Sequence, residues 1–225
     1  MKTILEKQIA GMGVTVMVPE RAFDSVLYVH PASSNATLDG HQLSCAVVQL
    51  YGVDWNRELS PWPAKRAFKG GEDFSGMADR HIATLTDVVI PQVEGKLCSL
   101  VKRDVSFNRI IAGYSLAGLF AVYSLFCTDA FCKAVSGSGS FWFDGFTDFV
   151  RNNSLKSSSP EVYLSLGECE SVSRNARLAA VLDCTNAVKR LLEEKGANVF
   201  FEMNSGGHFE DEAERMMKGY SRIGL

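Results

Sequence analysis

Hydrophobic and polar positions alternate in two runs near the start of the chain, Thr3 to Ile9 and Val14 to Val18. A period of two is typical of β-strands that have one face in the core. Gly11-Met12-Gly13 separates the two runs, and glycine permits the positive φ angles of a tight turn. The pattern therefore predicts an antiparallel hairpin.

Six later runs are short, continuously apolar and rich in β-branched residues, which is typical of strands buried on both faces of a parallel sheet. They are Ser25 to His30, Ala46 to Val53, Arg109 to Tyr114, Lys133 to Ser136, Glu161 to Leu166 and Asn198 to Met203. Together with the hairpin they give eight predicted strands.

Helical periodicity fills most intervals between the later strands. The predicted helices are Glu72 to Lys102, interrupted at Pro91; Leu116 to Phe126; Ser173 to Lys195, closed by Gly196; and Glu210 to Ile223. This order predicts an α/β fold with one mixed, mostly parallel eight-stranded sheet and helices on both faces. Folds of this kind bind ligands at the carboxyl ends of their strands.

Two segments that follow strands, Asp54 to Gly71 and Phe141 to Ser159, are rich in Trp, Pro, Ser and Asn. They are predicted to be loops over that edge of the sheet. The intervals between strands leave no room for a large inserted lid. Because the sequence contains no internal repeat and no linker, residues 1–225 are predicted to form a single domain.

Composition excludes several classes of protein. Of 225 residues, 46% are hydrophobic and 22% are charged, so the chain is not disordered. The 23 basic and 26 acidic residues are intermixed, and this disfavours nucleic acid and anionic membranes as partners. No run approaches a membrane span, and Met1 to Pro19 lacks the apolar core of a signal peptide, so we expect a cytoplasmic protein. The sequence leaves the oligomeric state unknown.

Six cysteines form no CxxC pair and lie mostly inside apolar runs. We interpret them as free thiols that pack in the interior, because neither a disulfide framework nor a zinc site has this spacing.

The most informative motif is Gly113-Tyr114-Ser115-Leu116-Ala117, which lies between a predicted buried strand and a predicted apolar helix. Small residues two positions before and after a serine let the backbone turn sharply and expose its hydroxyl, as in a nucleophile elbow. The N–H of Leu116 would then point to a developing oxyanion. The alternative is an ordinary strand-to-helix turn with Ser115 as a helix cap.

A serine nucleophile needs a base, and the chain has four histidines. His208 is favoured because it follows the last predicted strand, in the glycine-containing loop Asn204 to Phe209, just before the last helix. His30 ends the third predicted strand beside Pro31-Ala32-Ser33. We expect it to orient groups at the substrate, and the N–H of Ala32 or Ser33 to be the second oxyanion donor, because proline has none.

The acidic partner of the histidine should follow the seventh predicted strand, where the turn at Gly167 presents Glu168 and Glu170. Neighbouring side chains in an extended turn diverge, so only one of them can face His208. Glu170 is favoured, and Glu168 stays open.

Aromatic and basic side chains are the candidates for substrate contact. Tyr114 and Arg57 are predicted to contact substrate. The guanidinium of Arg57 would hold a carboxylate or phosphate, and the alternative is that it forms a structural ion pair. Four aromatic residues on the loops are predicted to line a pocket, with covering of the core as the alternative: Trp62, Phe141, Trp142 and Phe143.

These motifs together resemble the putative esterase family of α/β-hydrolases, the branch that includes esterase D and enterochelin esterase. The resemblance covers about Val26 to Ile223. Further blocks that carry it are Asn56-Arg57-Glu58-Leu59-Ser60-Pro61-Trp62, Gly70-Gly71-Glu72-Asp73-Phe74 with Ile90-Pro91, Ser138-Gly139-Ser140-Phe141-Trp142-Phe143 and Gly207-His208-Phe209.

The resemblance implies an α/β-hydrolase fold and an acyl-enzyme mechanism on esters or thioesters, with Ser115, Glu170 and His208 as catalytic residues and neither metal nor organic cofactor. Two positions depart from the family pattern. Ala117 replaces the usual glycine of the elbow, and His30-Pro31-Ala32 replaces the usual Asp-Gly oxyanion turn.

The predicted function is hydrolysis of a small or exposed carboxylic ester by an acyl-serine mechanism. The same residues would serve an acyltransferase, a peptidase or a lactonase, and the sequence does not separate these. A non-catalytic binding domain that retains the fold is the alternative from another class.

Overall fold

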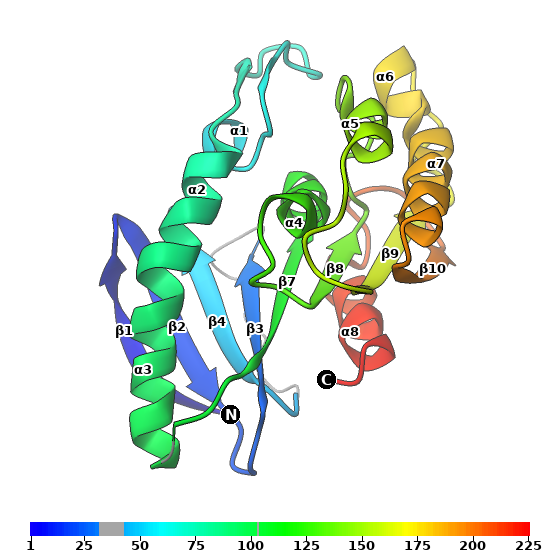
Figure 1. Cartoon of the computed structure of the whole chain (residues 1–225). Helices are drawn as coiled ribbons and strands as arrows, with labels where there is room; N and C mark the ends of the chain where they lie inside the picture. The colour runs from blue at the N-terminus through cyan, green and yellow to red at the C-terminus, as the bar shows by residue number, and fades with distance from the viewer. Residues whose placement is uncertain (32–42, 103) are drawn as a thin grey trace.

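The computed structural model describes residues 1–31, 43–102 and 104–225. Its main feature is an eight-stranded sheet with the order β1-β2-β4-β3-β7-β8-β9-β10 (Figure 1). The strands are β1 Lys2–Ile9, β2 Met12–Val18, β3 Ser25–His30, β4 Ala46–Tyr51, β7 Asn108–Tyr114, β8 Lys133–Gly137, β9 Glu161–Gly167 and β10 Asn198–Asn204. Strand β2 is antiparallel to both of its neighbours, and all later pairs are parallel. All eight predicted strands are confirmed.

The hairpin turns one residue pair earlier than the glycines indicated. Ile9 pairs with Met12, so the turn is Ala10-Gly11, with φ angles of 51° and 86°. Two positive φ angles in succession match the right-handed twist of the two strands. The second glycine, Gly13, lies inside β2.

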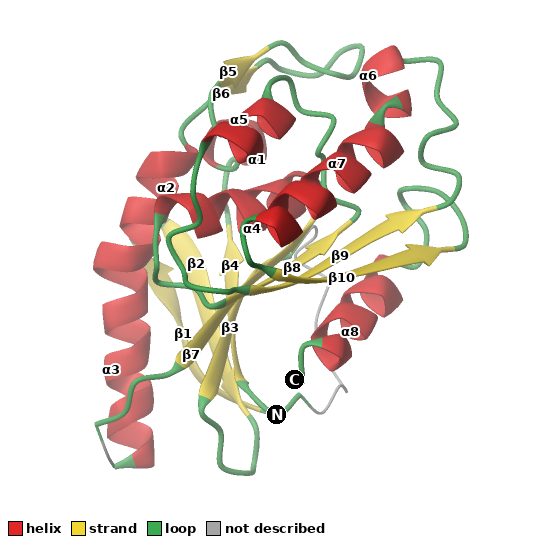
Figure 2. Ribbon diagram, turned by 45° about the vertical axis from the view of Figure 1, so that its right-hand side comes forward, coloured by secondary structure: helices red, strands yellow, loops and turns green. Residues whose placement is uncertain are grey.

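Helices cover both faces of the sheet, as predicted (Figure 2). Helices α2, α3, α4, α5 and α7 contribute to the larger core cluster on one face. On the other face α8 packs through Met216 and Tyr220, together with Ile223, which directly follows it. The helices are α1 Trp55–Glu58, α2 Ala78–Thr84, α3 Ile90–Val101, α4 Leu116–Cys127, α5 Phe146–Asn152, α6 Ala176–Ala179, α7 Val181–Glu194 and α8 Glu212–Arg222.

The helix predicted over Glu72 to Lys102 is wrong in two respects. It begins at Ala78, after a short strand, and Pro91 does not interrupt it, because a π-helical segment, Leu85–Val89, joins α2 to α3. Wider π turns accommodate the proline ring and its missing N–H. The helix predicted over Ser173 to Lys195 is divided into α6 and α7, and Gly196 follows α7 with a φ of 87°, as a glycine that ends a helix does.

The two predicted loops also contain short elements. One carries α1 and β5 Pro63–Ala64, which pairs with β6 Phe74–Ser75 just beyond the predicted loop, and the other carries α5. Asp54 caps α1, since its side chain accepts a hydrogen bond from the N–H of Arg57. These elements lie beyond the carboxyl ends of the parallel strands (Figure 2). They are too short to form a large lid.

Within the described ranges, no helix is both long and apolar enough to cross a bilayer.

Candidate active site

Ser115 lies at a sharp turn between β7 and α4, with φ 57° and ψ −120°. Its N–H donates to Gly137 O at 2.9 Å, and its own carbonyl accepts from the N–H of Ser140 at 3.0 Å. A Cβ added to Gly113 would lie 2.4 Å from the Cβ of Ala117 and 2.6 Å from its carbonyl carbon and oxygen, so only glycine fits at position 113. These contacts hold the backbone in a conformation that is strained for a serine.

The side chains of Ser115, His208 and Glu170 form one hydrogen-bonded chain. Ser115 Oγ is 2.9 Å from His208 Nε2, and His208 Nδ1 is 2.7 Å from Glu170 Oε2. Ser115 follows β7, Glu170 follows β9, and His208 lies between β10 and α8. The carboxyl ends of three parallel strands thus bring together residues that are far apart in the sequence.

Glu170, and not Glu168, faces the histidine. Its side chain is 3% exposed, whereas Glu168 lies on the surface. Burial by itself would raise the pKa of the Glu170 carboxyl. Hydrogen bonds from His208, Ser138 and the N–H of Gly167 outweigh burial, so this pKa lies below its usual range. The carboxylate is therefore ionised at neutral pH beside His208.

Arg215 was not recognised in the sequence, yet it holds this site together from α8. The guanidinium is 1% exposed. Its Nη1 donates to Glu170 Oε1 at 3.1 Å and to the Tyr114 hydroxyl at 3.0 Å. Its Nη2 donates to the carbonyls of Ser205 and Gly207, both at 2.8 Å. One side chain therefore binds the acid and fixes the backbone just before His208.

Of the predicted oxyanion donors, Leu116 lies within the described residues and Ala32 and Ser33 do not. Leu116 is the first residue of α4, and the N–H at such a position has no carbonyl partner within its helix. Leu116 also lines a cleft beside Ser115. Ala32 and Ser33, the predicted second donors, lie outside the described residues.

Among the described residues, two clefts have Ser115 in their lining, and Phe68 and Trp142 line both of them. The cleft on the side of His208 has a volume of about 280 Å³. The cleft on the side of Leu116 has a volume of about 170 Å³. Trp142 therefore lines the space beside Ser115, and its contact with substrate stays a prediction.

Three predicted substrate contacts have to be corrected. His30 is 1% exposed, and its Nε2 is 2.8 Å from Nε2 of the buried His81, so it lies in the core. Tyr114 is also buried, and its hydroxyl donates to the carbonyl of His208 at 2.8 Å. Arg57 lines a different cleft, together with Arg80 and His81, because its position in α1 turns it away from Ser115.

Of the other predicted pocket aromatics, Phe141 and Phe143 belong to the core and Trp62 is partly buried against it. Phe141 and Phe143 are 1% and 2% exposed, and Trp62 packs against Phe143 and donates from Nε1 to Asp144 O at 2.9 Å. Their loop sequences did not reveal that the rings point inward.

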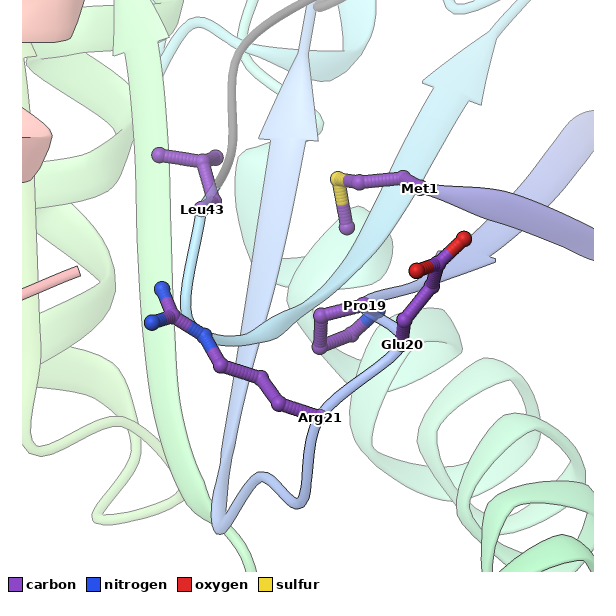
Figure 3. A pocket seen from close by; sticks show the side chains of 5 residues that line it. All are labelled: Met1, Pro19, Glu20, Arg21 and Leu43. Carbon is purple, nitrogen blue, oxygen red and sulfur yellow. The ribbon is translucent and has the colours of Figure 1, made fainter.

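A further hollow, of about 290 Å³, lies away from this site (Figure 3). It is lined by Met1, Pro19, Glu20, Arg21 and Leu43. Residues 19–21 precede β3, so the hollow lies at the amino ends of the parallel strands, opposite Ser115.

In the part of the chain that the structure describes, no three His, Cys, Asp or Glu side chains are grouped so that they could hold a metal ion.

The strand order, the antiparallel β2, the elbow after β7 and the histidine loop after β10 define an α/β-hydrolase fold. No family model matches the sequence. The uncharacterized protein YbbA of Bacillus subtilis (strain 168) is 30% identical over 140 residues, which are 62% of this chain and 55% of that protein. The chain therefore spans only about half the length of this relative.

Solved structures resemble the chain over nearly its whole length. An IroE-like serine hydrolase from Shewanella oneidensis superposes with a TM-score of 0.74 at 14% identity, over 94% of this chain and 75% of that one. The siderophore hydrolase EstA from Aspergillus nidulans gives a TM-score of 0.69 at 17% identity, over 94% and 89% of the two chains. The predicted fold is confirmed by these likenesses.

Proposed function

We propose that this chain is a serine hydrolase that cleaves a carboxylic ester through an acyl-enzyme on Ser115. The observation that carries the proposal is the hydrogen-bonded chain Ser115–His208–Glu170, with its serine at a strained elbow that opens on two clefts. The names of the two similar structures, a serine hydrolase and a siderophore hydrolase, are in keeping with it.

In the first step, His208 Nε2 takes the proton of the Ser115 hydroxyl as Oγ attacks the acyl carbon. The oxyanion binds the N–H of Leu116, with that of Ala32 proposed from the sequence alone as the second donor. The C–O bond of the ester then breaks, and His208 gives its proton to the leaving alcohol. A water molecule then attacks the acyl carbon as His208 Nε2 takes its proton. His208 returns this proton to Ser115 Oγ as the acid is released.

Glu170 and Arg215 act before and during these steps without touching substrate. The Glu170 carboxylate accepts from Nδ1 of His208, which leaves Nε2 free to accept the serine proton, and stabilises the imidazolium that forms. Arg215 holds Glu170 Oε1 and the histidine loop, so we assign it a positioning role.

Transfer of the acyl group to another acceptor, or cleavage of a peptide or lactone, would use the same residues. A non-catalytic binding domain is the rival from another class. The short distances between the serine, histidine and glutamate argue against it, because a binding domain has no need to keep all three in contact.

The test is labelling of the purified protein with a fluorophosphonate, with the modified residue identified by peptide mass spectrometry. We expect an adduct on Ser115 that is lost in Ser115→Ala and in His208→Ala. Ester turnover by Ser115→Ala should fall on the order of 10⁶-fold, as when other serine nucleophiles are removed. A folded wild-type protein that takes no label would support the binding domain instead.

The remaining proposals come from the sequence. Residues 1–225 form a single domain, the substrate is a small-molecule ester, neither nucleic acid nor a membrane is a partner, and the protein is cytoplasmic. Cell fractionation with an antibody to the chain tests the location.

A further inference from the structure

The cleft on the side of His208 is apolar and incompletely covered. Three of its side chains are exposed although they are large and hydrophobic: Phe209 is 89% exposed, Val172 83% and Phe68 54%. Leu178 and Val181 also line this cleft. Apolar side chains that gather at the rim of one cleft mark a site that an apolar group covers when it binds.

Among the described residues that line this cleft, the only side chain with a full charge is Glu170. Both of its oxygens are already bound, Oε2 to His208 and Oε1 to Ser138 and Arg215. The described walls of the cleft can therefore make apolar contacts with a substrate, but they carry no charged side chain that is free to form an ion pair with it.

The cleft on the side of Leu116 is smaller, about 170 Å³. Its described lining combines the rings of Trp55 and Phe74 with the polar side chains of Asn56, Arg66 and Glu72. It contains Leu116, whose N–H is the proposed oxyanion donor, and His208 is not among its described lining residues.

The path of the proton decides which part of an ester enters which cleft. His208 Nε2 must reach the oxygen that leaves, since it protonates the alcohol as the C–O bond breaks. The alcohol therefore lies on the side of His208, and the acyl chain, attached to the carbon whose oxyanion faces Leu116, lies on the other side.

Resting on the proposed function, we propose that the preferred substrates are esters of a bulky apolar alcohol with a short acyl group. The alcohol packs against Phe209, Val172 and Phe68 in the larger cleft, and the acyl group occupies the smaller cleft. Phe209, whose ring lies edge-on to His208 with centroids 5.0 Å apart, is a specificity-determining residue.

A pair of isomeric esters tests the assignment. Hexyl acetate and methyl heptanoate have the same formula and similarly poor leaving groups, and they differ in which side of the ester carries the long chain. We expect kcat/KM to be about tenfold higher for hexyl acetate, measured by acid release at constant pH, because its long chain enters the larger cleft and packs against the exposed apolar side chains there.

Variants connect this ratio to the cleft. Phe209→Ala and Val172→Asp should each lower kcat/KM for hexyl acetate several-fold, mainly through KM, and bring the ratio toward one. Leu100→Ala is the matched control, because Leu100 is also an exposed apolar side chain, 47% exposed, but lies on α3 outside both clefts. It should leave the ratio unchanged.

Equal rates for the isomers, or faster hydrolysis of methyl heptanoate, would overturn the assignment while the hydrolase stands. A fluorophosphonate adduct on Ser115 without hydrolysis of either isomer would overturn it as well. Absence of both the adduct and hydrolysis would instead refute the proposed function, so the two failures are distinguishable.

Discussion

At the scale of single residues, one oxygen of the Glu170 carboxylate, Oε1, accepts hydrogen bonds from three donors. Its Oε1 accepts from the N–H of Gly167 and from Ser138 Oγ, both at 2.7 Å, and from Arg215, which leaves Oε2 to His208. A buried carboxylate with this many partners is fixed in orientation as well as in charge. The tautomer of His208 therefore depends on one residue.

Glu170→Gln tests that dependence. The three donors around Oε1 require an acceptor, so the amide oxygen takes that position and the NH₂ group faces His208 Nδ1. Nδ1 must then accept, the ring proton moves to Nε2, and His208 no longer takes the serine proton. We expect kcat for ester hydrolysis to fall on the order of 10⁴-fold. The control is Glu168→Gln, which should keep full activity. Loss of activity in the control alone would make Glu168 the acid.

Arg215 gives a second prediction at this scale. Lysine keeps the charge but has a single ammonium group, which cannot reach the acceptors that the two Nη atoms bind. Both Arg215→Lys and Arg215→Met should therefore lower kcat by about 10²-fold, as a displacement of about 1 Å at a catalytic group does. KM should stay within about twofold, because Arg215 is not among the described residues of either cleft.

Arg222→Met is the control on the same helix, since Arg222 lies over the ring of Phe200 and away from Glu170. It should keep kcat. Rescue of kcat by lysine at position 215 would mean that charge alone matters there, against the positioning role.

At the scale of elements, a histidine pair joins β3 to α2 next to the elbow helix. Nε2 of His30 and Nε2 of His81 are 2.8 Å apart, and both rings pack against Phe120 of α4. Burial, together with the neighbouring His81, lowers the pKa of His30 well below its usual value, and burial lowers the pKa of His81 to about 4. The contact between these elements is therefore made by neutral rings.

This pair predicts a loss of stability in mild acid. Below about pH 6.5 the unfolded chain binds protons that the folded rings resist, so the free energy of unfolding falls as the pH decreases. His81 alone should account for about 2 kcal/mol between pH 7.5 and pH 5, measured by urea unfolding. In His81→Gln, the free energy of unfolding should differ less between pH 7.5 and pH 5 than it does in the wild-type protein. An unchanged difference in this variant would assign the acid sensitivity to other groups.

At the scale of the whole molecule, the sequence predicts those features well that follow from the spacing of hydrophobic residues. Eight strands, the elbow and the order serine, acid, histidine follow from long apolar runs and from residues directly after them. Helices α1 and α5 are too short, at four and seven residues, to show a period.

Side-chain direction was not predictable in the same way. Arg57 and Trp62 lie in one of the blocks that carry the family resemblance, yet Arg57 lines a separate cleft and Trp62 packs, partly buried, against the core. Arg215 had a faint signal, because it shares a helix face with the buried Gly219 at the spacing of one turn. A charged residue on an apolar helix face indicates a buried partner, but the sequence does not say which one.

The predicted single domain can be tested through the positions of the tryptophans. All three, Trp55, Trp62 and Trp142, lie on segments beyond the strand ends, and all three pack against the same core cluster as the sheet and its helices. Because these segments share the core of the sheet, they should not unfold before it. We expect urea unfolding curves from tryptophan fluorescence and from far-ultraviolet circular dichroism to have the same midpoint. A fluorescence transition at lower urea would mean that the segments over the active site unfold as a separate unit, and that the clefts beside Ser115 are lost before the fold is.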